Sequence, residues 1–178
     1  PNSDFVGDIA DEGVLRAFAA QVIADHGTVD YLINNACLTR GGLRTCSWDD
    51  FNYVLRVGVT APFLLTRLFL DHFSAQASVV NISSTRHLMS QADTESYTAA
   101  KGGITALTHA MAVTLAGRVR VNCISPGWID TTGSRFDGEG RQGVDIGKGI
   151  DQKGLVAFPG LILQGGAFYQ VKILAPGN

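Results

Sequence analysis

Tyr97 and Lys101 are the two residues whose types and spacing best fit proton-transfer chemistry. In a helix, side chains four residues apart lie one turn apart on the same face and can reach each other. An ammonium group beside a phenol favours the phenolate, so Lys101 is expected to lower the pKa of Tyr97 toward the working range of a general acid or base. Such a pair also arises by chance on helix surfaces, so it needs support from the rest of the chain.

Three short polar stretches supply this support, because each follows an apolar run that is typical of a buried strand. They are Asn34-Asn35-Ala36, Ser83-Ser84 and Pro126-Gly127. In an open parallel sheet, ligands bind outside the carboxyl ends of the strands. Residues of these types also form ordinary turns. Three of them in register with the Tyr97 helix nevertheless favour a site at one edge of a sheet.

The elements that must position these residues alternate between helix and strand. The pattern predicts the end of a strand at 5–9, helices at 11–26, 48–73 (with a bend at Pro62) and 96–116, and strands at 29–34, 78–83 and 119–124. Strands that are apolar throughout and alternate with helices indicate βαβ units. We therefore expect an α/β protein with a doubly wound parallel sheet.

Taken in order, the motifs resemble the short-chain dehydrogenase/reductase family over about residues 5–132. The resemblance implies a Rossmann-type sheet that is N-terminally truncated, because the family's Gly-rich turn is absent and by family length about 50 residues that carry it precede Pro1. Residues 1–132 would form a partial dinucleotide-binding catalytic domain. Residues 133–178 would add a Gly-rich loop and an atypical C-terminal segment of the same domain.

The resemblance also assigns roles to single residues. It makes Tyr97 the general acid/base, Ser84 the hydrogen-bond donor to the reacting oxygen, and Lys101 a ligand of the nicotinamide ribose. The other implied cofactor contacts are Asp8 and Ile9 at the adenine, Asn34 and Ala36 in the cleft, Pro126 and Gly127 after the third strand, and Ile129 and Thr131 at the carboxamide. The implied activity is NAD- or NADP-dependent interconversion of a secondary alcohol and a ketone, with a small-molecule substrate.

Two positions inside the matching region depart from the family. Gly58 stands where the family has an Asn that holds a water in its proton relay. Without a side chain at Gly58, either the backbone holds this water or turnover is weakened, and we expect Gly58→Asn to be tolerated and to leave activity unchanged or raise it. The other interpretation is that this glycine marks a close approach of two backbones. Cys37 stands where the family usually has Gly, and we expect a small buried thiol rather than a group that narrows the cleft.

Arg86 and His87 follow Ser84 at the expected mouth of the site. A cation there could bind a carboxylate on the substrate. The alternative is a solvated surface charge.

Two other functions compete with the dehydrogenase. The first is a truncated or catalytically silent relative that acts as a binding or interaction module, which Gly58 and the missing Gly-rich turn favour. The second is a nucleotide-dependent epimerase or dehydratase, which shares the Tyr-x-x-x-Lys spacing but not the motifs around it. The choice between NAD and NADP stays open, because the residues that distinguish the two cofactors lie at the end of a strand that the sequence lacks.

Composition excludes several other classes. The chain has 178 residues, 46% hydrophobic and 17% charged, and a net charge of −2. The sequence has no basic stripe for nucleic acid, and its most apolar run is too short to cross a membrane. Three widely spaced cysteines fit neither a metal site nor a disulfide framework. We therefore expect a reduced, cytoplasmic protein without a metal, and a homo-oligomer by analogy with the family.

Overall fold

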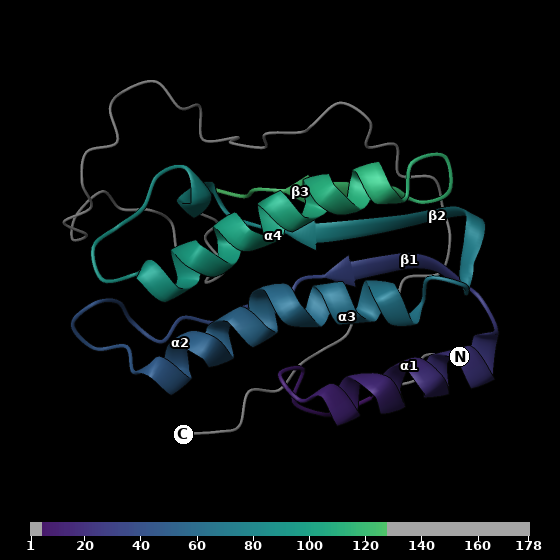
Figure 1. The fold of residues 1–178 in the computed structure, drawn as a ribbon, viewed down its shortest axis with the longest axis horizontal. Helices are drawn as coiled ribbons and strands as arrows, with labels where there is room; N and C mark the ends of the chain where they lie inside the picture. The colour runs from purple at the N-terminus through teal and green to yellow at the C-terminus, as the bar shows by residue number, and fades with distance from the viewer. Residues whose placement is uncertain (1–4, 128–178) are drawn as a thin grey trace, which may run out of the picture.

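The computed structural model describes residues 5–127, which form a three-stranded parallel sheet with the order β1-β2-β3 (Figure 1). Its strands are β1 (Val29–Asn34), β2 (Phe73–Ile82) and β3 (Arg120–Ile124). The helices are α1 (Glu12–His26), α2 (Trp48–Leu55), α3 (Ala61–Leu68) and α4 (Glu95–Thr114), joined by a π-helical segment η1 (Arg56–Thr60) and a 3₁₀ turn η2 (Thr85–His87). The expected α/β architecture with a Rossmann-like parallel sheet is confirmed.

The three strands end level with one another. Asn34 of β1 pairs with Asn81 of β2, and Ile82 of β2 pairs with Ile124 of β3. Figure 1 shows α1, the α2–α3 pair and α4 in one layer that covers one face of the sheet. The segments that follow β1, β2 and β3 therefore meet at one edge, as parallel strands with helical connections require.

Local sequence signals explain where the helices begin and end. The Asp11 carboxylate accepts a hydrogen bond from the backbone N–H of Val14 at 3.1 Å, and Ser47 Oγ accepts one from Asp50 N–H at 3.0 Å. Both are N-caps, which satisfy backbone donors that the helix cannot pair internally. Gly27 ends α1 with a φ of 74°, in the region that favours glycine.

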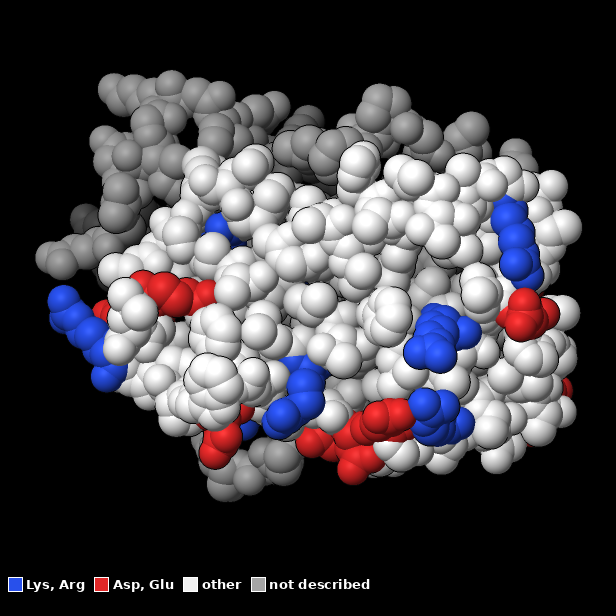
Figure 2. Space-filling view, in the orientation of Figure 1, with Lys and Arg blue, Asp and Glu red and all other residues white. Residues whose placement is uncertain are grey.

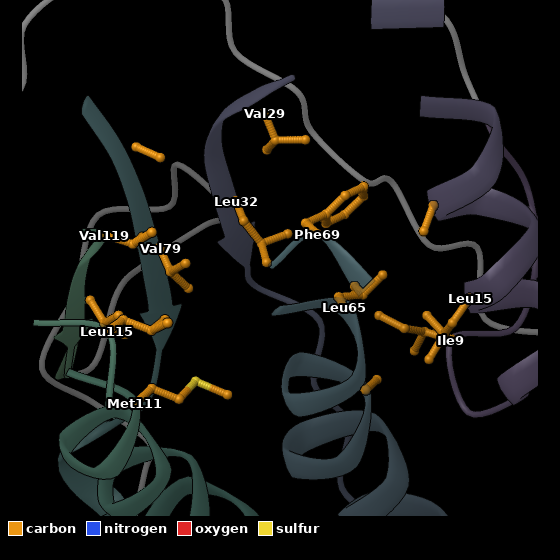
Figure 3. Packing of buried hydrophobic residues seen from close by; sticks show 14 of the residues in the cluster. Ile9, Leu15, Val29, Leu32, Leu65, Phe69, Val79, Met111, Leu115 and Val119 are labelled. Carbon is orange, nitrogen blue, oxygen red and sulfur yellow. The ribbon is translucent and has the colours of Figure 1, made fainter. Parts of the chain in front are cut away.

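The hydrophobic core lies between the sheet and the helical layer (Figure 3). Leu65 of α3 and Phe69, which directly follows α3, meet Leu32 and Val79 from the strands. Phe69 also contacts the Phe18 ring edge-to-face at 6.3 Å between centroids. Burying a side chain of this size stabilises the fold by about 1.5–3 kcal/mol. The core thus fixes α3 against the strands whose ends form the site.

The prediction of one long helix at 48–73 is wrong in two respects. It is interrupted by η1, and it ends at Leu68, so that Phe73 opens β2 instead. Pro62 has no N–H to donate to the carbonyl one turn earlier, and the preceding turn widens so that Ala61 N–H bonds to Arg56 O. The bend expected at Pro62 therefore takes the form of a π segment just before it.

The strand end expected at 5–9 is also wrong. Residues 5–8 are neither helix nor strand, a turn follows at Ile9 and Ala10, and no strand within residues 5–127 pairs with them. The Phe5 ring instead packs edge-to-face on Phe18, with 5.5 Å between centroids. The remaining predicted elements are confirmed, with strand β1 at its predicted bounds and β2 five residues longer at its start.

Candidate active site

Backbone hydrogen bonds join the segments that follow β2 and β3. Ser83 N–H donates to Ile124 O at 2.7 Å, and Thr85 N–H donates to Pro126 O at 3.0 Å. Ser84 lies between these two anchors and is buried. The structure therefore brings Ser84 and Pro126 together at the carboxyl edge of the sheet, as the sequence motifs predict.

Helix α4 places Lys101 against the end of β2. Lys101 is only 3% exposed, and its ammonium donates to Ile82 O at 2.7 Å. In return, Ser83 Oγ donates to Lys101 O at 2.8 Å. These two bonds fix the position of α4 along the strand, so Tyr97, one turn earlier, faces the same edge.

Ser84, Tyr97 and Lys101 converge as predicted. Lys101 Nζ lies 5.4 Å from the centroid of the Tyr97 ring, and the Ser84 hydroxyl interacts with the Tyr97 phenol, which is half-buried. Two hydroxyl donors close together can both reach one substrate oxygen. The arrangement can therefore polarise a carbonyl group and deliver a proton to its oxygen.

The expectation that Lys101 lowers the pKa of Tyr97 is not supported. Burial raises the pKa of Tyr97 above its ordinary value, while its interactions with Ser84 and Arg86 lower it, and Lys101 is not among the causes. The ammonium lies over the ring and donates to the Ile82 carbonyl. Burial also lowers the pKa of Lys101 itself.

Cys37 corrects a second expectation. Its thiol is exposed rather than buried, and it interacts electrostatically with both Tyr97 and Lys101. The loop after β1 therefore brings a side chain beside Tyr97 and Lys101, at a position where the family usually has none. Cys123, by contrast, is buried in β3 as expected.

Asn34 is held by a buried chain of amides and hydroxyls that crosses the fold. Asn34 Nδ2 donates to Asn81 Oδ1 at 2.7 Å, Asn81 Nδ2 donates to Thr108 Oγ1 at 2.9 Å, and Thr108 donates to Ile104 O at 2.7 Å. Asn81 is fully buried and was not predicted as a site residue. An asparagine within the apolar run of β2 was the available signal, because a buried amide requires partners.

The remaining predicted cofactor contacts have different surroundings. The Asp8 carboxylate accepts hydrogen bonds from Ala10 N–H at 2.9 Å and Tyr53 O–H at 3.1 Å. Ile9 belongs to the hydrophobic core, and Ala36 packs against it. Gly127 is exposed, with open space where a Cβ would lie. Ile129 and Thr131 lie outside the described residues, as does the segment 133–178.

Gly58 marks a close approach between η1 and α4. A Cβ at Gly58 would lie 2.8 Å from the Ala100 Cβ, and a Cβ at Gly103 would lie 2.9 Å from Val59 Cγ2. Neither Ala100, which is buried, nor the helix backbone can move freely. Of the two interpretations of Gly58, the structure favours the close approach, next to the helix that carries Tyr97.

Gly58→Asn is therefore expected to destabilise the fold by about 1–3 kcal/mol through overpacking. Urea unfolding measures this change as a lower transition midpoint. Gly102→Ala is the matched control, because a Cβ at Gly102 meets nothing within 4 Å and an alanine is favoured over glycine in a helix. A Gly58→Asn chain as stable as the unmodified chain would contradict the close-approach interpretation.

The hydrogen-bonding capacity of Lys101 suits the hydroxyl groups of a ribose. Lys101 is a buried ammonium for which residues 5–127 supply one short hydrogen bond and no carboxylate partner. An ammonium has three N–H donors, so donors remain for the ribose hydroxyls.

Residues 5–127 contain no cluster of three metal-ligating side chains and no helix long and apolar enough to span a membrane.

Comparison with known proteins shows which proteins the chain is similar to. Residues 2–146 match the family model described as Enoyl-(Acyl carrier protein) reductase. An uncharacterized oxidoreductase of Thermotoga maritima is 36% identical over 129 residues, which cover 70% of this chain and 50% of that protein. The 2-(R)-hydroxypropyl-CoM dehydrogenase of Xanthobacter autotrophicus is 37% identical over 131 residues, 70% of this chain and 52% of that protein.

Solved structures give the same result. An apo SCOR enzyme from Clostridium thermocellum has a TM-score of 0.67 and 44% identity, covering 70% of this chain and 52% of its own. A blue fluorescent protein from a metagenomic library, in complex with NADPH, has a TM-score of 0.67 and 30% identity, covering 74% and 55%. The chain spans about half the length of the curated relatives it matches.

A parallel sheet, a helical layer and a polar site at the carboxyl ends of the strands define a Rossmann-type nucleotide-binding protein. With the matches above, the chain belongs to the short-chain dehydrogenase/reductase family. NAD or NADP is the cofactor that this membership supports.

Proposed function

We propose that this chain is the catalytic part of an NAD(P)-dependent oxidoreductase that interconverts a secondary alcohol and a ketone. The observation that supports this function is the convergence of the Ser84 and Tyr97 hydroxyls beside the buried Lys101 ammonium. Two donors aimed at one oxygen are what a carbonyl needs as negative charge develops on it.

Each residue has one task in this mechanism. The bound cofactor supplies or accepts the hydride. Ser84 donates a hydrogen bond to the carbonyl oxygen, and Tyr97 gives that oxygen its proton in reduction, or removes the alcohol proton in oxidation. Lys101 holds the ribose hydroxyls, while Asn81 orients Asn34 at the end of β1. The half-buried position of Tyr97 strengthens its interactions by limiting water.

The second candidate is a relative that binds cofactor or a partner without turnover. Gly58 favours it, because a glycine packed on Ala100 offers no side chain for a proton-relay water. Turnover decides between the two candidates. Purified chain is mixed with NADH or NADPH and a panel of ketones, and absorbance of the reduced cofactor is followed. Cofactor binding without any consumption would favour the silent relative.

We also propose a homo-oligomer that pairs through the outer faces of α3 and α4. Phe63 and Val113 are exposed there, and Figure 2 shows a broad surface without charged residues over α4. Exposed apolar side chains on an uncharged helical face are typical of subunit contacts. Light scattering of the purified chain tests this proposal, and a monomeric mass at micromolar concentration would count against it.

Lys101→Met is expected to stabilise the chain without cofactor by about 1 kcal/mol while removing cofactor affinity. The reason is that a buried ammonium without a carboxylate partner disfavours folding. The pKa of folded Lys101 lies below the unfolded value of about 10.4. Between these values the unfolded state binds more protons, so the stability of the unmodified chain rises with pH.

The advantage of the Lys101→Met variant should therefore be largest near pH 7 and shrink toward about pH 10. Urea unfolding of both chains at these two pH values measures it, and groups common to both chains cancel in the difference. A variant that is less stable than the unmodified chain at neutral pH would show that the ammonium contributes net stability instead.

A further inference from the structure

Arg86 differs from the other arginines of residues 5–127. All seven others are exposed, whereas Arg86 is half-buried. Its Nη2 donates to Gln91 Oε1 at 2.5 Å and its Nη1 donates to Thr94 Oγ1 at 3.5 Å. Both acceptors are neutral, and no carboxylate among the described residues forms an ion pair with Arg86.

Arg86 also lies beside the reacting groups. Its backbone N–H donates to Ser84 Oγ at 3.2 Å, so the turn that carries Arg86 positions the Ser84 hydroxyl. Its guanidinium is close enough to Tyr97 to lower the pKa of the phenol. Arg86 therefore lies beside both Ser84 and Tyr97, in the turn that follows β2.

The remaining donors of Arg86 suit an anionic group. A guanidinium has five N–H donors, of which Gln91 and Thr94 use two, so three remain. A partly desolvated cation without a counter-ion is unfavourable. A carboxylate can accept two parallel hydrogen bonds from a guanidinium, which offsets this cost.

We propose that Arg86 binds a carboxylate of the substrate and makes this site selective for oxo acids, or the matching hydroxy acids, over neutral ketones. This inference rests on the proposed function, since it names the substrate class of the same site. Gln91 and Thr94 hold the guanidinium in place, and Ser84 and Tyr97 receive the carbonyl oxygen. The substrate thus has an acidic group on the η2 side of its carbonyl.

The test compares an oxo acid with its methyl ester, which keeps the carbonyl but loses the charge. Arg86→Gln is expected to lower kcat/KM for the acid by about 10- to 150-fold more than for the ester, the range of a hydrogen bond to a charged group. A fall in kcat/KM that is equal for both substrates reflects the changed surroundings of Tyr97, and it cancels when the acid is compared with the ester. Arg86→Lys keeps the positive charge but cannot form two parallel hydrogen bonds to a carboxylate. Its preference for the acid over the ester should therefore lie between those of the unmodified chain and Arg86→Gln.

Arg120→Gln is the matched control. It removes the same charge from an exposed position at the start of β3, at the opposite end of the strands from Ser84. For Arg120→Gln, kcat/KM for the acid divided by kcat/KM for the ester should equal the value for the unmodified chain. Equal losses on acid and ester in Arg86→Gln would overturn the proposal and leave Arg86 a residue that only holds its loop.

A binding measurement separates failure of this inference from failure of the proposed function. Isothermal titration of the chain with the oxo acid, with NAD(P)H present, needs no turnover. If the chain does not consume cofactor yet binds the acid, and Arg86→Gln weakens this binding at least tenfold, the proposed function fails while the carboxylate site stands. The inference is overturned by absence of binding to the unmodified chain, or by equal affinity in Arg86→Gln.

Discussion

Replacing Tyr97 with phenylalanine is expected to lower kcat about 10²- to 10⁴-fold, the usual contribution of a positioned general acid or base. Only the phenolic oxygen is lost. The ring that Lys101 approaches at 5.4 Å remains, and so does its packing on α4. The thermal midpoint and the affinity for NADPH or NADH should therefore stay close to those of the unmodified chain.

Tyr53→Phe is the matched control for this variant. Tyr53 also carries a phenol, which donates to the Asp8 carboxylate at 3.1 Å, outside the Ser84 and Tyr97 pair. Its removal should cost at most a few-fold in turnover. If Tyr97→Phe kept more than a tenth of the activity, another group would have to supply the proton.

The pH dependence of the reaction follows from the same residue. Reduction needs the protonated phenol, and burial raises the pKa of Tyr97 above about 10, the ordinary value. The protonated form therefore persists through neutral pH, and the rate of reduction should fall only above that value. Oxidation needs the phenolate and should rise with pH over the same range. In Tyr97→Phe, the rates of reduction and oxidation should no longer change in opposite directions with pH.

Ser84→Ala is expected to lower kcat about 10²- to 10³-fold, which is typical of removing one donor to a developing oxyanion. Its Oγ accepts a single backbone hydrogen bond, from Arg86 at 3.2 Å, so the effect on folding should be small. Steady-state kinetics and thermal melts of the same preparation measure the two effects.

Ser83→Ala provides the contrast. The Ser83 hydroxyl is bonded to Lys101 O and Thr105 Oγ1, both at 2.8 Å, and so connects β2 to α4. Removing it should lower stability by about 1 kcal/mol while leaving more activity than Ser84→Ala does. If the two serines exchanged these phenotypes, the roles assigned to them would be wrong.

The order of elements and the position of the site could be predicted from the sequence, because both depend on patterns that are local. Apolar runs give β1 and β3, Asp11 and Gly27 bound α1, and the motifs after the strands place Ser84 at the edge of the sheet. Parallel strands with helical connections leave few ways to arrange such elements. The convergence of Ser84, Tyr97 and Lys101 followed from this arrangement.

What could not be predicted depends on contacts between residues that are distant in the sequence. Gly58 packs on Ala100 across two helices, and Asn81 joins Asn34 to Thr108 across the sheet. The direction of the pKa shift of Tyr97 depends on how deeply the phenol is buried, which spacing alone does not give. The exposure of Cys37 likewise follows from the path of its loop.

The most direct test of the proposed function is a thermal-shift titration of this chain with NADH and with NADPH. A cofactor that binds only the folded state stabilises it by about 2.7 kcal/mol at a hundred times its Kd. We predict a saturable rise in the melting temperature with at least one of the two, and its loss in Lys101→Met. A cooperative melt that neither cofactor shifts would contradict the proposal, because the residues would be assembled without a working cofactor site.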